Sequence, residues 1–252
     1  LIIYGSAAGG YYIKGKSDIN LLVVLTPEGA DRLDEALDLV KKWRKHRVAT
    51  PWVMTKEFIH KSLDCYPIEF LNLQINHVLI YGEDVLTPLQ FKPQDLRLQI
   101  EKELKGKLIL LREGYLETEG NSRQIRQLIN RSLMAFVSIF NALIYLKQAA
   151  VPHQRRETIK HMAKLYTFDS DVFLTCVAIK EGVDNLSGAE VAGVFKKYLR
   201  EVENICNIVD ALVLLIKYFI REVKNGFQKE NFNRCCCSHC SSGNQRVFLF
   251  RR

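Results

Sequence analysis

The chain has 252 residues, of which 48% are hydrophobic and 25% charged, a balance typical of a soluble globular protein rather than of a disordered or fibrous one. Its formal net charge is +8, but residues 229–252 hold five Lys or Arg and one Glu, so half of the excess falls in a short tail. We therefore expect no dense basic face and no nucleic-acid partner. The most apolar run, residues 205–220, contains Asp210 and Lys217, so we expect a buried helix there and no membrane association.

The first ninety residues alternate between short apolar runs and helical patterns, which is typical of an α/β layer. The chain begins without Met inside the apolar run of residues 1–4, so we expect the natural domain to begin upstream. The predicted order is strand 1–4, strand 19–25, helix 27–47, strand 49–54, helix 56–63 and strand 67–73, with residues 78–81 either an edge strand or a short helix.

After Pro88 and Pro93 the pattern changes to long helical periodicity. Helices are predicted at 94–118, 122–148, 155–166, 169–181 and 187–225, and such a set packs as a bundle. The predicted fold class is therefore α+β, with a small mixed-sheet domain over residues 1–90, a helical bundle over residues 91–228 and a disordered, Cys-rich basic tail over residues 229–252.

Polar residues with a functional pattern lie around the first loop. Gly5 and Ser6 end the first predicted strand, and Asp18 and Asn20 open the second. Because strand side chains alternate, Asp18 and Asn20 should project from one face. Gly5 lets a backbone approach phosphate closely, while Ser6 offers a hydroxyl and an amide. Such oxygen donors suit Mg²⁺ bound to a nucleoside triphosphate.

This segment resembles the nucleotidyltransferase superfamily of DNA polymerase β, whose signature is a hydrophobic strand, Gly-Ser, a short spacer and Asp-x-Asp, followed by a third carboxylate on a later strand. Here eleven residues separate Ser6 from Asp18, and Glu69 lies in a predicted strand. Gly5, Ser6, Asp18 and Glu69 match the signature, whereas Asn20 replaces its second aspartate. Over residues 1–86 the pattern is most similar to the aminoglycoside adenylyltransferases and related small enzymes, which likewise carry a helical second domain.

The resemblance implies transfer of a nucleoside monophosphate from ATP or another nucleoside triphosphate to a hydroxyl of a small molecule or a protein, with Mg²⁺ and release of pyrophosphate. The residues it assigns are Asp18 and Glu69 as catalytic groups, Asp18, Asn20 and Glu69 as metal ligands, and Gly5, Ser6, Lys16 and Ser17 as nucleotide-binding groups. Asn20 removes one negative charge from the metal site, so the alternative is a catalytically degenerate module that binds a nucleotide or a protein partner. The charges of Lys14 and Lys16 fit either a phosphate contact or a solvated loop.

The cysteines indicate a reducing compartment. Cys65, Cys176 and Cys206 are scattered in apolar contexts, which suits buried free thiols and a cytoplasmic location. Four more crowd the tail beside His239, but adjacent cysteines cannot readily share one tetrahedral zinc ion. We therefore expect a disordered terminus there rather than a structural metal site.

Overall fold

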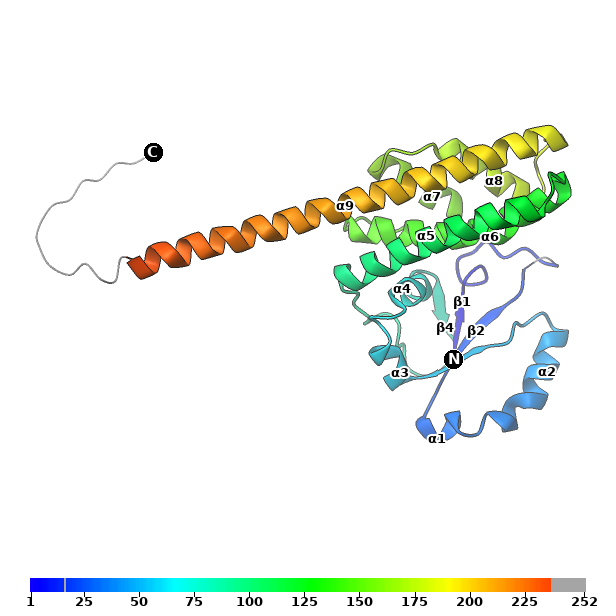
Figure 1. Ribbon diagram of the computed structural model, residues 1–252. Helices are drawn as coiled ribbons and strands as arrows, with labels where there is room; N and C mark the ends of the chain where they lie inside the picture. The colour runs from blue at the N-terminus through cyan, green and yellow to red at the C-terminus, as the bar shows by residue number, and fades with distance from the viewer. Residues whose placement is uncertain (16, 237–252) are drawn as a thin grey trace, which may run out of the picture. The chain divides into compact units, whose positions relative to one another are not determined.

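The computed structural model describes residues 1–15 and 17–236. They fall into two compact units, one over Leu1–Cys206 and one that begins at Asn207. The first unit combines a small mixed sheet with a layer of long helices, as the α+β prediction requires (Figure 1). Lys16 and most of the predicted tail lie outside the described residues.

The sheet has four strands in the order β3-β2-β1-β4. Strand β1 (Ile2–Tyr4) pairs antiparallel with β2 (Asn20–Leu25) and with β4 (His77–Leu79), while β3 (Trp52–Thr55) runs parallel to β2. The predicted strands near residues 1–4, 19–25 and 49–54 are confirmed, and residues 77–79 form the edge strand. This order sets the ends of β1 and β2 side by side, with Tyr4 opposite Asn20.

The segment that follows β2 is broken into three short helices instead of the single predicted helix 27–47. These are α1 (Pro27–Ala30), the 3-10 helix η1 (Leu33–Ala36) and α2 (Leu37–Lys45). Thr26 caps α1 because its hydroxyl oxygen accepts a hydrogen bond from the Gly29 amide at 3.2 Å. None of the three helices has a buried residue, so little packing energy holds the segment in one continuous helix.

The predicted strand at residues 67–73 is wrong. This segment forms the helix α4 (Pro67–Ile75), which follows the short helix α3 (Lys56–Lys61). Proline is well suited to the first helical position, and Pro67 occupies it. Because α4 packs against two of the long helices that follow it, most of its residues are buried, and its pattern of apolar residues can be taken for that of a strand.

Five long helices follow α4 and β4. They are α5 (Pro93–Glu117), α6 (Ser122–Leu146), α7 (Arg155–Leu165), α8 (Ser170–Glu181) and α9 (Gly188–Cys236). The first four lie close to the predicted positions, but α9 continues eleven residues beyond the predicted end at residue 225, so residues 229–236 are helical and the predicted disordered tail is wrong there. Helix α6 is central to the first unit because it packs against α4, α5, α7 and α8. Its N-terminus is capped by Asn121, whose side-chain oxygen accepts hydrogen bonds from two backbone amides of the first turn.

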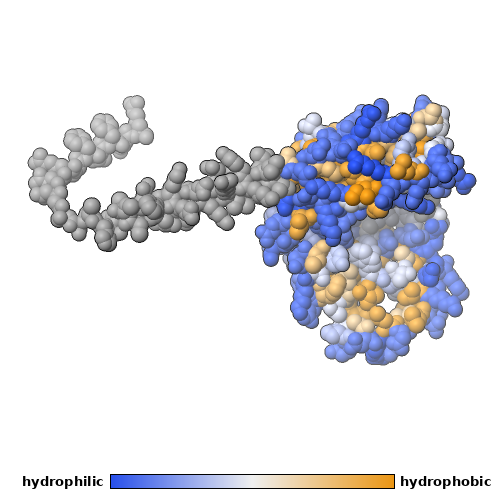
Figure 2. Space-filling view, in the orientation of Figure 1, coloured by the Kyte–Doolittle hydropathy of each residue, from blue (hydrophilic) through white to orange (hydrophobic). Residues whose placement is uncertain are grey.

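Aromatic side chains fill the core of the helical layer. Phe136 and Phe140 of α6, Phe173 of α8 and Tyr198 of α9 are fully buried and meet mostly edge to face. Helix α6 is the only helix of the described part that is long and apolar enough to cross a membrane, but 56% of its most apolar window is buried inside the fold. In Figure 2, hydrophilic residues dominate the outer face of the helical layer, and hydrophobic residues also reach the surface over the sheet layer.

Candidate functional site

A tight turn carries the chain away from the end of β1. The Gly5 amide donates to the carbonyl oxygen of Asn76 at 3.0 Å, and the Gly9 amide donates back to the carbonyl oxygen of Gly5 at 2.8 Å. Gly5 has a φ of +75°, and a Cβ at this position would lie 3.2 Å from the side-chain nitrogen of Asn20. The turn thus needs glycine both for its backbone conformation and for its approach to β2.

The side chains of Asp18 and Asn20 lie next to this turn at the start of β2. Asn20 is the first residue of the strand, and the preceding Ile19 forms an isolated parallel bridge with Val48. Asp18 Oδ1 lies 3.3 Å from the guanidinium of Arg47, and both side chains are about half exposed. In the described part of the chain the Asn20 side chain makes no hydrogen bond, so its amide oxygen is available to a ligand.

Glu69 is held in the first turn of α4 rather than on a strand. Its Oε2 accepts a hydrogen bond of 2.6 Å from the side-chain nitrogen of Gln99 on α5, and the side-chain oxygen of Gln99 accepts one of 2.8 Å from the Ile68 amide. The buried Gln99 thus satisfies one of the free amides at the helix N-terminus and orients the Glu69 carboxylate.

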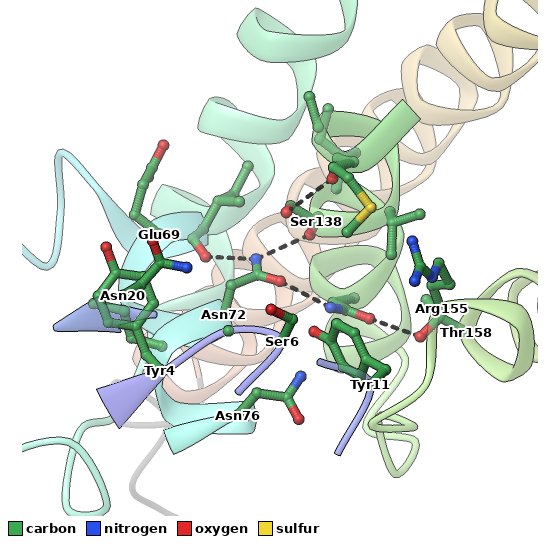
Figure 3. Close-up of a pocket in the computed structure, with 18 of the residues that line it drawn as sticks. Tyr4, Ser6, Tyr11, Asn20, Glu69, Asn72, Asn76, Ser138, Arg155 and Thr158 are labelled. Atoms are coloured by element: carbon green, nitrogen blue, oxygen red, sulfur yellow. Dashed lines mark hydrogen bonds between the residues drawn. The ribbon is translucent and has the colours of Figure 1, made fainter. Parts of the chain in front are cut away.

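A ladder of amide side chains ties α4 to the bundle. One turn after Glu69, the side-chain nitrogen of Asn72 donates to the carbonyl oxygens of Ile68 and Ser138 at 2.8 and 3.1 Å. The side-chain nitrogen of Asn141 donates to the side-chain oxygen of Asn72 at 2.8 Å, and the Thr158 hydroxyl donates to Asn141 at 3.1 Å (Figure 3). Helices α4, α6 and α7 are therefore linked by hydrogen bonds, which satisfy polar side chains that are buried or partly buried.

These elements enclose a cavity of about 630 Å³ between the sheet layer and the long helices, a volume typical of small-ligand sites. Figure 3 shows Tyr4, Ser6, Asn20 and Glu69 around it. All the predicted site residues that the structure describes line this one cavity: Gly5, Ser6, Ser17, Asp18, Asn20 and Glu69. Lys16 lies outside the described residues, and Lys14 is exposed and does not line the cavity.

The bundle side of the cavity carries cations that the sequence analysis missed. Arg155 at the start of α7 and Lys180 in the last turn of α8 line the cavity, and so does Lys107, which is paired with Glu103 at 2.7 Å. The guanidinium carbon of Arg155 lies 5.5 Å from the centre of the Tyr11 ring. No local motif joins these cations, because they come from three different helices and meet only in the folded chain.

The oxygen ligands around the cavity are of the kind that magnesium binds, but only two of them carry a negative charge. Asp18 and Glu69 supply carboxylate oxygens and Asn20 an amide oxygen to the same cavity, and hard cations bind such ligands together with phosphate oxygens and water. Among the residues that the structure describes, no group of three or more His, Cys, Asp or Glu side chains is placed to hold a metal ion. A divalent cation held here would therefore rely on two carboxylates, one amide and the phosphates of its own ligand.

Comparison of the chain with protein-family models, with curated proteins and with solved structures found no match. A function for this chain is therefore inferred from its own residues and their geometry.

Proposed function

We propose that this chain is a Mg²⁺-dependent nucleotidyltransferase, which moves a nucleoside monophosphate from ATP or another nucleoside triphosphate to a hydroxyl group. The observation that carries the proposal is the meeting of the Gly5-Ser6 turn with Asp18, Asn20 and Glu69 around a single cavity. A turn that exposes backbone amides and a hydroxyl suits phosphate, and oxygen donors beside it suit the cation that accompanies phosphate.

In this reaction the acceptor hydroxyl attacks the α-phosphorus of the nucleotide. A new oxygen–phosphorus bond forms, the bond between the α-phosphorus and the bridging oxygen breaks, and pyrophosphate leaves. The chain contributes mainly by positioning: Ser6 and the turn amides hold the phosphates, and Glu69 either takes the proton of the hydroxyl or binds the cation. Mg²⁺ would be held by Asp18 and Asn20, and by Glu69 where Glu69 is not the base, and it would neutralise negative charge on the phosphates.

Two observations favour a second candidate, a nucleotide-binding module that has lost its activity. Asn20 stands where the related signature has an aspartate, and Asp18 already has a cationic neighbour in Arg47. Both features weaken the field that would attract a second divalent cation. This candidate predicts that nucleotide binds in the cavity without any transfer.

Transfer of label from α-labelled ATP separates the two candidates. The full chain is incubated with Mg²⁺ and a panel of hydroxyl acceptors that includes aminoglycosides and proteins. If the chain is an enzyme, labelled product should form and Asp18→Ala should abolish it. Asp34→Ala, at an exposed position that does not line the cavity, is the control and should leave transfer unchanged. Label transfer that is equal in Asp18→Ala and the unmodified chain would exclude the proposed site, whereas nucleotide binding without transfer would support the inactive module.

The substitution Asn20→Asp tests the metal site itself. If Asn20 is an impaired ligand, a restored carboxylate should raise Mg²⁺-dependent transfer at least tenfold, because an added negative charge at the cation strengthens its binding. A fall in transfer would show instead that the amide of Asn20 serves the reaction as it stands.

A further inference from the structure

Two cations meet on the bundle side of the cavity. Figure 3 places Arg155 across the cavity from Glu69 and Asn20. Lys180 comes from the neighbouring helix α8 and lines the same cavity. The positive groups are thus separated from the predicted metal ligands by the space that a substrate would fill.

The charge of this pair is poorly compensated by the protein. Lys180 Nζ donates to the backbone carbonyl oxygen of Asn130 at 2.9 Å, and within the described ranges no carboxylate lies at ion-pair distance from it. Arg155 Nε lies 3.7 Å from Oε1 of Glu181, whose other oxygen accepts a hydrogen bond from Arg156. One carboxylate therefore serves two arginines and leaves the lysine without a counter-charge.

Burial makes this excess of charge costly. The side chain of Arg155 is only 14% exposed. Burial, and then the nearby guanidinium of Arg155, lower the pKa of Lys180. Like charges in a partly desolvated place repel each other unless an anion joins them. Lys107 is not part of this uncompensated charge, because it forms an ion pair with Glu103.

We propose that Arg155 and Lys180 bind an oxyanion of the ligand, a phosphate or carboxylate group, on the bundle side of the cavity. The inference rests on the proposed function only for the origin of that anion, which is either the outer phosphates of the nucleoside triphosphate or an anionic group of the acceptor. An acceptor that is a polycation, such as an aminoglycoside, would bring its own positive charges against this pair. If the anion belongs to the acceptor rather than to the nucleotide, the acceptor is therefore an anionic hydroxyl compound and not a polycation.

Binding measured without metal tests the oxyanion site separately from the reaction. The full chain is titrated calorimetrically with inorganic phosphate, pyrophosphate and ATP in the presence of a chelator. The variants are Arg155→Gln, Lys180→Met and their combination. Lys160→Gln is the control for each single variant, because this substitution removes one positive charge, as each of them does, and Lys160 lies on α7 without lining the cavity. Thermal unfolding of each variant shows whether it remains folded.

The double variant should bind pyrophosphate at least tenfold more weakly than the unmodified chain, and Lys160→Gln should bind it unchanged, because only the double variant loses charge-assisted hydrogen bonds to the bound anion. If ATP affinity falls in parallel, the anion is the nucleotide's own phosphate. If ATP affinity is retained, the anion belongs to the acceptor. Unchanged binding of all three probes in the folded double variant, or no binding of any of them to the unmodified chain, would overturn the proposal.

The metal-free titration separates this result from the fate of the proposed function, because it requires neither Mg²⁺ nor group transfer. Pyrophosphate binding that is lost in the double variant but intact in Lys160→Gln, together with no label transfer by the unmodified chain, would support the oxyanion inference and count against the enzyme.

Discussion

The side chain of Gln99 holds the Glu69 carboxylate and the first turn of α4 at the same time. Its nitrogen donates to Glu69 Oε2 at 2.6 Å, and its oxygen accepts from the Ile68 amide at 2.8 Å. Gln99 is buried on α5, so these two bonds replace the water that both groups would otherwise bind. The position of Glu69 in the cavity thus depends on a residue that lies thirty positions along the chain.

Replacing Gln99 by Leu should therefore disturb both stability and the site. We expect a loss of about 2 kcal/mol in the free energy of unfolding, because the Ile68 amide and the Glu69 carboxylate lose a buried partner. Denaturant unfolding measures this loss. If the chain is an enzyme, kcat should fall by about tenfold with little change in KM, since Glu69 loses its orientation rather than the substrate its contacts.

The substitution Gln99→Glu should also reduce stability, but by an amount that depends on pH. A carboxylate at this position can still accept from the Ile68 amide, but at pH 7 it repels Glu69. On acidification one of the two carboxyl groups gains a proton and can donate to the other. The loss of stability relative to the unmodified chain should therefore be larger at pH 7 than at pH 4.5, and a pH-independent loss would contradict this account.

Gly5 and Gly10 form a matched pair for testing the turn after β1. Both have a φ of +75°, but a Cβ on Gly5 would lie 3.2 Å from the Asn20 side chain, whereas a Cβ on Gly10 would have no neighbour within 4 Å. Gly10→Ala should cost about 1 kcal/mol from backbone strain alone. Gly5→Ala should cost more and, in addition, weaken ATP binding by displacing Asn20. Equal effects of the two substitutions on nucleotide affinity would exclude a close approach at Gly5.

Asp84 should make the stability of the sheet layer depend on pH. Burial opposes its ionisation, but hydrogen bonds from Thr87, Leu86 and His77 outweigh that effect and hold the pKa of Asp84 well below its usual value. Because the folded-state pKa is lowered, the ionised carboxylate stabilises the fold above the unfolded value of about 4, and this contribution is lost as the pH falls further. Asp84→Asn should cost about 1 kcal/mol at pH 7, a difference that shrinks on acidification below pH 4.

The loop between α8 and α9 is fastened to α6 by Arg126. Its Nη1 donates to both oxygens of Asp184 at 2.6 and 2.8 Å, and its Nη2 donates to the Leu186 carbonyl oxygen at 2.6 Å. The Asp184 side chain is only 7% exposed, so Arg126→Met should leave a buried carboxylate unpaired and cost roughly 2–3 kcal/mol in thermal unfolding. The exposed pair of Arg32 and Glu35 provides the control, because Arg32→Met should change stability very little.

Local pattern predicted most of the fold, and its failure at residues 67–73 is informative. The strand prediction for residues 67–73 followed an apparent alternation of two residues, but the polar positions Glu69, Asn72 and Asn76 recur every three or four residues, which is a helical spacing. Together with Pro67 at the first helical position, this spacing was a signal in the sequence. The helical periodicity of α4 is weak because α5 and α6 cover faces of this helix that would otherwise be polar.

Some residues of the candidate site could be predicted from the sequence, and others could not. The residues from Gly5 to Asn20 form one local motif, so their joint position could be predicted from the spacing of two strands. Arg155 and Lys180 reach the cavity from α7 and α8, far along the chain, and Gln99 reaches it from α5. Their arrangement depends on how α6 packs against its neighbours, which no short pattern encodes.

The amide ladder from Asn72 through Asn141 to Thr158 has a consequence for selectivity. It fixes the helix that carries Glu69 at a set separation from the helix that carries Arg155. A cavity with a fixed distance between these two helices favours ligands whose charged groups are separated by the same distance. Asn141→Leu would remove the hydrogen bonds that fix this distance, so the chain should then bind compounds of a wider range of lengths.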